Sequence, residues 1–184
     1  MSPKYLFGKN IFTMVILLFP VLAYGQTTIQ DSIWKHLQFF IGSWTGEGGG
    51  DPGEGNYERK YQFIFNNNFI EVKNKSVFPP SDNNPKGEVH EDIGYISFDK
   101  LRNTFVLRQF HIEGFVNQYK LDGISTDGKR IVFISESIEN IKTGWRAKET
   151  YQILGDKEFK ETFELAPPNK EFEVCSKVTL ERTD

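Results

Sequence analysis

The sequence contains few of the residues on which most enzyme and metal sites depend. Its 184 residues include one cysteine and three histidines, and neither a G-x-S-x-G nor an H-E-x-x-H motif occurs. The lone Cys175 cannot form an internal disulfide, so the fold must be stable through packing alone. Its spacing to His111 does not require a Cys–His pair, and we expect Cys175 to be a small residue packed in a strand.

Basic residues do not outnumber acidic ones in this sequence. The chain has 22 basic and 25 acidic residues, and its formal net charge is −3. Proteins that bind nucleic acid present basic faces to the phosphate groups. The composition therefore predicts that nucleic acid is not a partner of this protein.

The first 25 residues have the three-part pattern of a secretory signal peptide. Lys4 and Lys9 form a short basic region, and an apolar run extends from Ile11 to Leu22. The small residues Ala23 and Gly25 then occupy the two positions that a signal peptidase reads. The run is shorter than the ~20 apolar residues that a membrane span needs, and it contains a proline.

We therefore predict a signal peptide over residues 1–25 and a secreted mature chain over residues 26–184. Cleavage removes two lysines and no acidic residue, which leaves 20 basic and 25 acidic residues and a formal charge of −5. We expect the mature protein to be exported to the periplasm or to the extracellular medium, without an integral membrane span. Its length suits one domain that buries a sizeable core.

One short helix is expected near the start of the mature chain, from about Asp31 to Ile41. Asp31 or Ser32 can cap its N-terminus, and five apolar residues follow one stripe of the helix. These residues are Ile33, Trp34, Leu37, Phe40 and Ile41. His36 lies between them and is expected to face solvent.

From Ser43 onward the apolar pattern changes to a period of two, which indicates β-strands. Residues 57–65 alternate, and three asparagines then form a turn because asparagine tolerates left-handed backbone angles. The chain returns through residues 69–78, which predicts a hairpin. Further strand-like runs lie at 91–98, 104–112, 115–122, 130–138, 145–154, 158–165 and 171–181.

Strands joined by short turns, with no helical crossover between them, favour a sequential antiparallel sheet. An open sheet of that length leaves two unpaired edges, and closure into a barrel removes them. The predicted fold class is therefore all-β, an antiparallel barrel of about 8–10 strands with a short N-terminal helix that covers one end. A β-sandwich is the alternative.

The stretch from Gly48 to Gly53 matches the pattern G-x-G-x-x-G. A dinucleotide site needs this loop between a strand and a helix N-terminus, where backbone N–H groups meet the pyrophosphate. Here Asp51 is acidic, Pro52 has no N–H, and a strand follows. We expect these glycines to let the first strand bend across the barrel.

A second weak pattern consists of His90, Glu91 and Asp92 together with His111. Neighbouring residues of a strand point to opposite faces, so His90 and Asp92 can share a face that Glu91 cannot join. No cysteine pair or helical histidine motif accompanies them. This pattern alone does not predict a metal site.

Polar residues on the inward face of the strands form the predicted ligand site. Arg59 shares its face with aromatic residues, so strict alternation places its guanidinium inside the barrel. A buried charge is costly, so Arg59 needs an internal carboxylate such as Glu149, a position at the rim, or an anionic ligand. The predicted ligand-binding residues are Arg59, Tyr61, Gln109, His111, Trp145 and Glu149.

Two stretches resemble the signatures of a known group of proteins. Leu37 to Gly48 resembles the opening of the nitrobindin-like, haem-binding-like barrels and of an uncharacterised bacterial lipocalin-like family, a domain of unknown function. Gly87 to Tyr95 resembles a second signature of both groups, and Phe172 to Arg182 resembles their last strand. The motif residues are Gly42, Trp44, Gly46 and Gly48 in the first stretch and His90, Glu91, Gly94 and Tyr95 in the second.

The resemblance implies a ten-stranded calycin-like, lipocalin-like barrel with a cavity. Nitrobindins hold haem iron through a histidine in the last strand, and no histidine follows His111 here. Cys175 falls near that position, and a thiolate can ligate haem. The alternation of Val174 and Val178 would turn Cys175 away from an apolar interior. The cofactor is therefore left open, with haem as the one that the resemblance names.

The leading hypothesis is an exported, non-catalytic barrel that binds a small, partly apolar ligand, which Arg59 suggests is anionic. The first alternative is an enzyme of the isomerase or hydrolase type, with His111, Glu149 or Tyr61 as acid or base in the cavity. The second alternative is a ligand-free protein that works through its surface. A filled interior would exclude both the ligand-binding hypothesis and the enzyme hypothesis.

Overall fold

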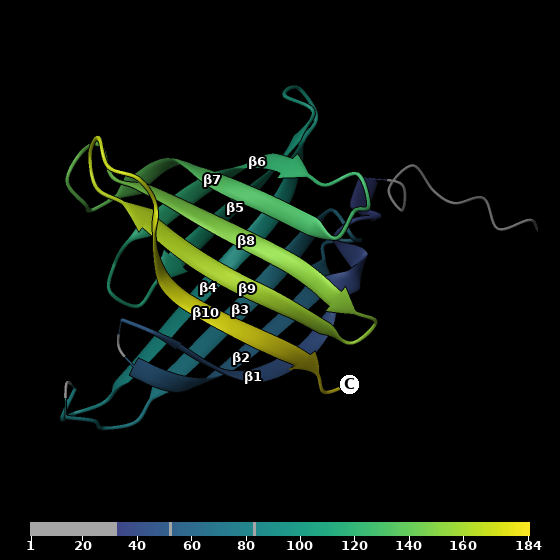
Figure 1. Ribbon diagram of the computed structural model, residues 1–184. Helices are drawn as coiled ribbons and strands as arrows, with labels where there is room; N and C mark the ends of the chain where they lie inside the picture. The colour runs from purple at the N-terminus through teal and green to yellow at the C-terminus, as the bar shows by residue number, and fades with distance from the viewer. Residues whose placement is uncertain (1–32, 52, 83) are drawn as a thin grey trace, which may run out of the picture.

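Ten antiparallel strands form a closed barrel in the computed structural model, which describes residues 33–51, 53–82 and 84–184 (Figure 1). Each strand pairs with its neighbours in the sequence, and β1 pairs with β10 to close the ring. The elements are η1 (Gln38–Phe40), β1 (Gly42–Gly50), β2 (Gly53–Ile64), β3 (Phe69–Phe78), β4 (Glu88–Asp99), β5 (Thr104–His111), β6 (Val116–Ile124), β7 (Arg130–Glu139), β8 (Arg146–Gly155), β9 (Glu158–Ala166) and β10 (Glu173–Arg182). The predicted antiparallel barrel is confirmed, and the β-sandwich is excluded.

Strand β2 illustrates how alternation in the sequence produces an inner and an outer face. Tyr57, Arg59 and Tyr61 are buried, whereas Glu58 and Lys60 between them are exposed. Aromatic side chains suit such a half-buried pleated surface because they pack against neighbours on the same face. The alternation also places a charged residue, Arg59, on the inner face, as the sequence predicts.

The turns occur where the sequence predicts them. In the β2–β3 hairpin, Asn66 and Asn67 have φ angles of 55° and 60°, a left-handed conformation that asparagine tolerates. Asn103 and Gly128 also have positive φ, in the connections after β4 and β6. Short hairpins fix the register of consecutive strands, and the register decides which side chains enter the barrel.

The closing pair of strands, β1 and β10, depends on glycine. A Cβ atom at Gly46 would collide with the carbonyl oxygen of Thr179, and one at Gly48 would collide with that of Lys177. Glycine therefore lets the two backbones approach as closely as the register requires. Gly48 and Gly53 lie on consecutive strands with no helix after them, so the G-x-G-x-x-G match is not a dinucleotide loop.

The segment before β1 plugs one end of the barrel with Trp34, Leu37 and Phe40, each at most 4% exposed. Leu37 N–H donates to the Trp34 carbonyl at 2.8 Å, and Phe40 N–H donates to the Leu37 carbonyl at 3.1 Å. Bonds between residues three apart bring every third side chain to one face, which is the 3-10 geometry of η1. The predicted short N-terminal helix is therefore replaced by a 3-10 turn, and its proposed caps lie outside the described residues.

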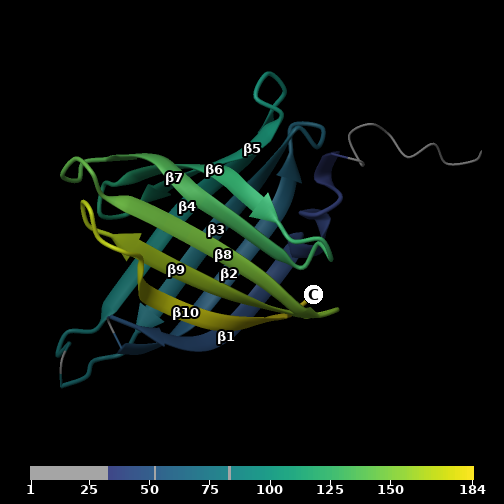
Figure 2. The same ribbon diagram turned by 45° about the horizontal axis from the view of Figure 1, so that its top comes forward.

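Aromatic side chains fill the plugged half of the barrel. The ring of Phe159 on β9 lies edge-on to Phe40 and to Trp44, with centroid distances of 5.0 and 4.8 Å. Trp44 Nε1–H donates to the Phe40 carbonyl at 2.7 Å, and the Arg182 guanidinium lies 4.2 Å from the Trp44 ring centroid. These contacts join the plug to both closing strands, at the end where the chain also terminates (Figure 2).

The described residues contain no helix that is both long enough and apolar enough to cross a membrane. The apolar run from Ile11 to Leu22 and the predicted signal peptide lie outside the part of the chain that the structure describes.

Replacing Phe40 with alanine tests whether the plug stabilises the barrel. Phe40→Ala removes a buried ring from the aromatic cluster, and we expect it to lower the free energy of unfolding by about 3–5 kcal/mol. Leu101→Ala is the matched control, since Leu101 is 99% exposed, and its effect should be within about 0.5 kcal/mol. Urea denaturation measures both variants, and equal effects would show that the plug does not contribute.

Candidate functional site

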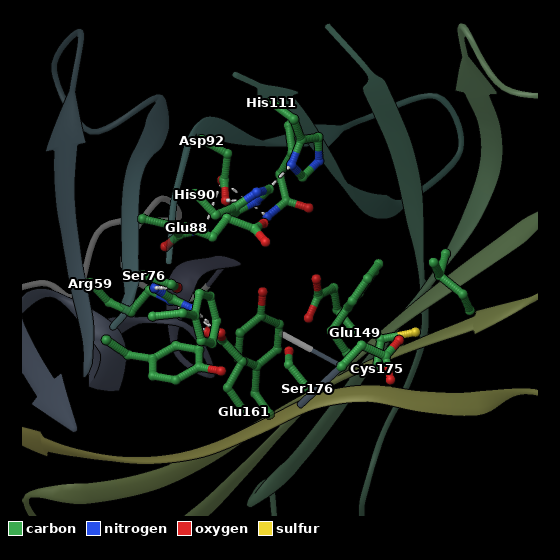
Figure 3. Close-up of a pocket in the computed structure, with 18 residues that line it drawn as sticks. Arg59, Ser76, Glu88, His90, Asp92, His111, Glu149, Glu161, Cys175 and Ser176 are labelled. Carbon is green, nitrogen blue, oxygen red and sulfur yellow. Dashed lines mark hydrogen bonds and ion pairs between the residues drawn. The ribbon is translucent and has the colours of Figure 1, made fainter. Parts of the chain in front are cut away.

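The half of the barrel opposite the plug encloses a cavity of about 240 Å³ (Figure 3). One part of its wall is apolar and consists of Tyr57, Phe78, Tyr151, Phe163 and Leu165. Polar and ionisable side chains from β2, β3, β4, β5, β8, β9 and β10, together with Asp51 before β2, form the rest. An aromatic-lined cavity with a few converging polar groups is typical of a small-molecule site.

A buried ion pair between Arg59 and Glu161 lies in the cavity wall. Arg59 Nη2 donates to Glu161 Oε1 at 2.6 Å, and Arg59 Nε donates to both carboxylate oxygens at 3.1 Å. Arg59 Nη1 also donates to the Lys75 carbonyl at 3.1 Å and to Ser76 Oγ at 3.3 Å. Burial by itself would lower the pKa of Arg59, but the attraction and hydrogen bonds of Glu161 raise it above its usual value.

The partner of Arg59 is therefore Glu161, and the salt bridge with Glu149 considered from the sequence is not formed. Arg59 is 7% exposed and Glu161 is 8% exposed, so this guanidinium does not reach solvent at the rim. Phe159, Glu161 and Phe163 alternate along β9, so Glu161 shares the inward face of the two phenylalanines. This pattern predicts an inward carboxylate, which the sequence analysis missed. An acidic residue between two inward phenylalanines is the natural partner for a buried arginine.

Glu149 on β8 is buried in the same cavity and is 7% exposed. Within the described part of the chain, its carboxyl group has no ion pair or side-chain hydrogen bond. Burial, together with repulsion from Glu161 and Asp92, raises its pKa well above the usual value of 4.5. Glu149 is therefore a neutral carboxylic acid over an extended pH range, and it offers a hydrogen-bond donor to the cavity.

Two histidines and an aspartate meet at the mouth of the cavity. His90 Nε2 lies 3.8 Å from Asp92 Oδ2 and 3.4 Å from His111 Nδ1. Burial and the nearby His90 lower the pKa of His111 to about 4, so its imidazole is neutral at pH 7. Burial raises the pKa of Asp92 to about 6, against the opposing attraction of Arg59 and His90.

Several buried polar atoms of the cavity wall have no hydrogen-bond partner among the described residues. They are the Tyr57 hydroxyl, Asn74 Oδ1 and Gln109 Oε1. Gln109 is 3% exposed, and its amide nitrogen donates to Asp92 Oδ1 at 3.4 Å. A buried polar group without a partner costs about 1–3 kcal/mol, so these atoms favour a bound molecule that supplies the partners.

Four of the six predicted ligand-binding residues line the cavity, and they are Arg59, Gln109, His111 and Glu149. Tyr61 lies deeper, where its ring packs 5.7 Å from that of Phe40, and it is part of the core. Trp145 does not line the cavity and lies just before β8 begins.

The residues of the two family motifs divide into structural and cavity positions. Strand β1 holds Gly42, Trp44, Gly46 and Gly48. Gly46 and Gly48 allow β10 to approach β1, and Trp44 contacts the plug. On β4, His90 lines the cavity, whereas Glu91 and Tyr95 lie on the outer face. A Cβ atom at Gly94 would lie 3.2 Å from Gln109 Cγ, so this glycine leaves room for the Gln109 side chain.

Cys175 lines the cavity mouth, although strand alternation predicts that it faces outward. The pairing of β10 with β9 shifts register between Val174 and Ser176, and Cys175 is the extra residue of this β-bulge. Burial and the nearby Asp51 raise the pKa of its thiol, which disfavours the thiolate that haem ligation needs.

The residues present do not fit haem. The cavity of about 240 Å³ is smaller than the ~300–1,000 Å³ of pockets for drug-sized ligands, and a porphyrin is larger than those ligands. Its wall also carries the acidic residues Asp51, Glu88, Asp92, Glu149 and Glu161, which do not suit a dianionic porphyrin. We therefore attribute no role to haem in this cavity.

No protein-family model matches the chain, and no curated protein matches it. The crystal structure of Rv2717c from M. tuberculosis is similar, with a TM-score of 0.62 and 18% sequence identity over 83% of this chain and 98% of that chain. A de novo designed fluorescence-activating β-barrel has a TM-score of 0.41 and 14% identity, over 79% of this chain and 95% of that one.

The likeness to Rv2717c shows a shared fold, and the fold is consistent with a calycin-like barrel. The finer resemblance to nitrobindin-like barrels stays a prediction. The designed barrel is too dissimilar to support any further comparison.

Replacing Glu149 with glutamine tests whether the cavity holds a neutral carboxyl group. The folded-state pKa is raised, so ionisation of Glu149 favours unfolding, and the wild-type protein loses stability as pH rises above about 4.5. We expect Glu149→Gln to match the wild type near pH 4 and to gain relative stability at higher pH. The gain in unfolding free energy relative to wild type should approach about 1.4 kcal/mol per pH unit, which is the slope for the release of one proton on unfolding.

Urea denaturation at pH 4, 6 and 8 measures this difference in unfolding free energy. Glu47→Gln, an exposed substitution on β1, is the control and is expected to keep the wild-type profile. A stability difference between Glu149→Gln and wild type that stays constant with pH would contradict the assignment.

Proposed function

We propose that this protein binds a small molecule in the open half of its barrel. The observation that carries the proposal is a cavity whose buried polar atoms lack partners among the described residues, Gln109 Oε1 above all. A packed barrel that acts through its surface has no reason to keep such atoms buried and unsatisfied. The cavity volume, slightly below that of drug-sized pockets, favours a compact ligand.

The chemistry of the wall suggests what kind of ligand fits. Tyr57, Phe78 and Tyr151 offer aromatic surface to an apolar part of the ligand, and Gln109 Oε1 and Asn74 Oδ1 offer acceptors to N–H or O–H groups. The Glu149 carboxyl offers a donor in its protonated form, which burial favours by raising its pKa. The ligand we propose is therefore partly apolar and carries both donors and acceptors.

That the ligand is anionic stays a prediction. The buried guanidinium of Arg59, which suggested an anion, has another explanation. Arg59 was expected to need either an internal carboxylate or an anion, and Glu161 supplies the carboxylate. The cavity wall holds more acidic than basic side chains. A ligand with a neutral or cationic polar group fits that wall better than an anion.

The enzymatic alternative has one supporting observation. Glu149 and His111 line the same cavity, and their environments move their pKa values in opposite directions, which is the arrangement of an acid and a base. An isomerase or hydrolase of this kind would release a changed molecule. A non-catalytic binding protein would release its ligand unchanged, so chemical analysis of the bound molecule separates the two.

Native mass spectrometry of the protein purified from its natural host tests the binding role. We expect a reproducible adduct that is lost on denaturation. Gln109→Leu removes the unpartnered acceptor, and we expect it to weaken ligand affinity about tenfold. The fraction of protein that carries the adduct should fall accordingly. Gln152→Leu on β8, at a residue that does not line the cavity, is the control and should keep the adduct.

A bare wild-type mass, with no change of melting temperature in an extract of the host's small molecules, would contradict a binding role. An adduct kept by Gln109→Leu would place the ligand elsewhere.

We also propose that the protein is exported after loss of its first 25 residues. The basic region, apolar run and small residues at positions 23 and 25 support this proposal. The intact mass of the protein from the periplasm or medium is expected to correspond to residues 26–184. Leu17→Arg interrupts the apolar run and should leave full-length protein in the cytoplasm. Recovery of uncleaved wild-type protein there would contradict export.

A further inference from the structure

His90, Asp92 and His111 bring three metal-ligating atoms together at the cavity mouth. The hydrogen bonds of β4 and β5 place Asp92 opposite His111, and His90 lies two residues earlier on the same face of β4. One ligand atom from each residue lies within 4.8 Å of the other two. We propose that these three residues bind a divalent first-row transition metal ion, with Zn²⁺ as the best fit.

The spacing of the atoms suits such an ion. Zn²⁺ binds histidine nitrogen and carboxylate oxygen at about 2.0–2.2 Å, so two ligands of a tetrahedral site lie about 3.3–3.5 Å apart. His90 Nε2 lies 3.4 Å from His111 Nδ1 and 3.8 Å from Asp92 Oδ2. Small side-chain rotations bring the three atoms to coordination distance.

The surroundings hold two of the ligands in the orientation that coordination needs. His90 Nδ1 lies 2.7 Å from Glu113 Oε1, so its N–H donates to that carboxylate and its Nε2 lone pair faces the cluster. Carboxylates that orient a histidine in this way are usual around zinc. Asn74 Nδ2 donates to Asp92 Oδ1 at 2.8 Å, which leaves Oδ2 directed at His90.

Asn117 supports the third ligand. His111 Nε2 lies 3.1 Å from Asn117 Nδ2, and Asn117 Oδ1 has no partner among the described residues. Coordination through His111 Nδ1 moves its proton to Nε2. Rotation of the Asn117 amide by a half turn then presents Oδ1 as the acceptor of that proton. The N–H···O bond would fix the ring for metal binding.

The set of ligands is that of a functional metal site. Three protein ligands leave one tetrahedral position, and all three residues line the cavity, so the open position faces the space where a ligand or water binds. This inference does not rest on the proposed function, because the ion is held by protein atoms alone.

A neighbouring group, Glu88, His90 and Glu113, is the rival arrangement. It shares His90 with the first group but uses exposed carboxylates at the rim. The two arrangements cannot be filled together through the same nitrogen of His90. They differ in whether His111 or Glu88 is needed, which the variants below separate.

Titration calorimetry of untagged, EDTA-treated protein with Zn²⁺ tests the proposal. We expect one Zn²⁺ per chain, and an electronic spectrum of tetrahedral Co²⁺ when Co²⁺ replaces it. His111→Ala and His90→Gln should each weaken Zn²⁺ binding by at least about tenfold, and Glu113→Gln should weaken it by about 10–100-fold through orientation of His90. His36→Ala is the matched control, because His36 lies near Gly128 at the plugged end, and it should bind as the wild type does.

Melting temperatures in EDTA establish that each variant is folded, and a Zn²⁺-dependent rise in the wild-type melting temperature reports binding without any variant. Absence of Zn²⁺ uptake by the wild-type protein would overturn the proposal. A loss of Zn²⁺ affinity in His36→Ala as large as that in His111→Ala would also overturn it. Binding that survives His111→Ala but is lost in Glu88→Gln would assign the rival group at the rim instead.

Discussion

Closure of the sheet between β1 and β10 is the constraint on which the rest of the structure depends. A ring of ten strands has no free edge, but it creates an interior that must be filled at both ends. The plug around Phe40 fills one end with aromatic rings. The glycines of β1 keep the closing strands close, and the Arg182 guanidinium contacts the Trp44 ring between them. The opposite half holds a cavity with an apolar wall on one part and polar side chains on the rest.

Charge inside that second half is balanced internally. Arg59 and Glu161 neutralise each other through three hydrogen bonds, so the remaining acidic groups determine the character of the cavity. Burial raises the pKa of Glu149 and so disfavours its charged form, which would be a second buried charge. A buried pair of this kind adds little net stability compared with apolar residues, but it holds both side chains in one geometry.

Much of the fold could be predicted because each strand carries a period-two pattern and each turn carries its own chemistry. The inward positions of Arg59, Gln109 and Glu149 follow from that alternation. Prediction failed where alternation breaks. Cys175 enters the cavity through a β-bulge, and Trp145 lies before β8 begins. A bulge adds one residue to one strand, and no residue type near Cys175 predicts it.

Alternation and turn residues in the sequence are enough to predict consecutive strands, their hairpins and the inward positions of Arg59, Gln109 and Glu149. These properties are local, because backbone preference and side-chain period act within a few residues. Which inward residues meet follows instead from the three-dimensional arrangement of the strands. Arg59 pairs with Glu161, which is 102 residues away, and His90 meets His111 across the β4–β5 pair. Such contacts depend on register and closure, which couple distant parts of the chain.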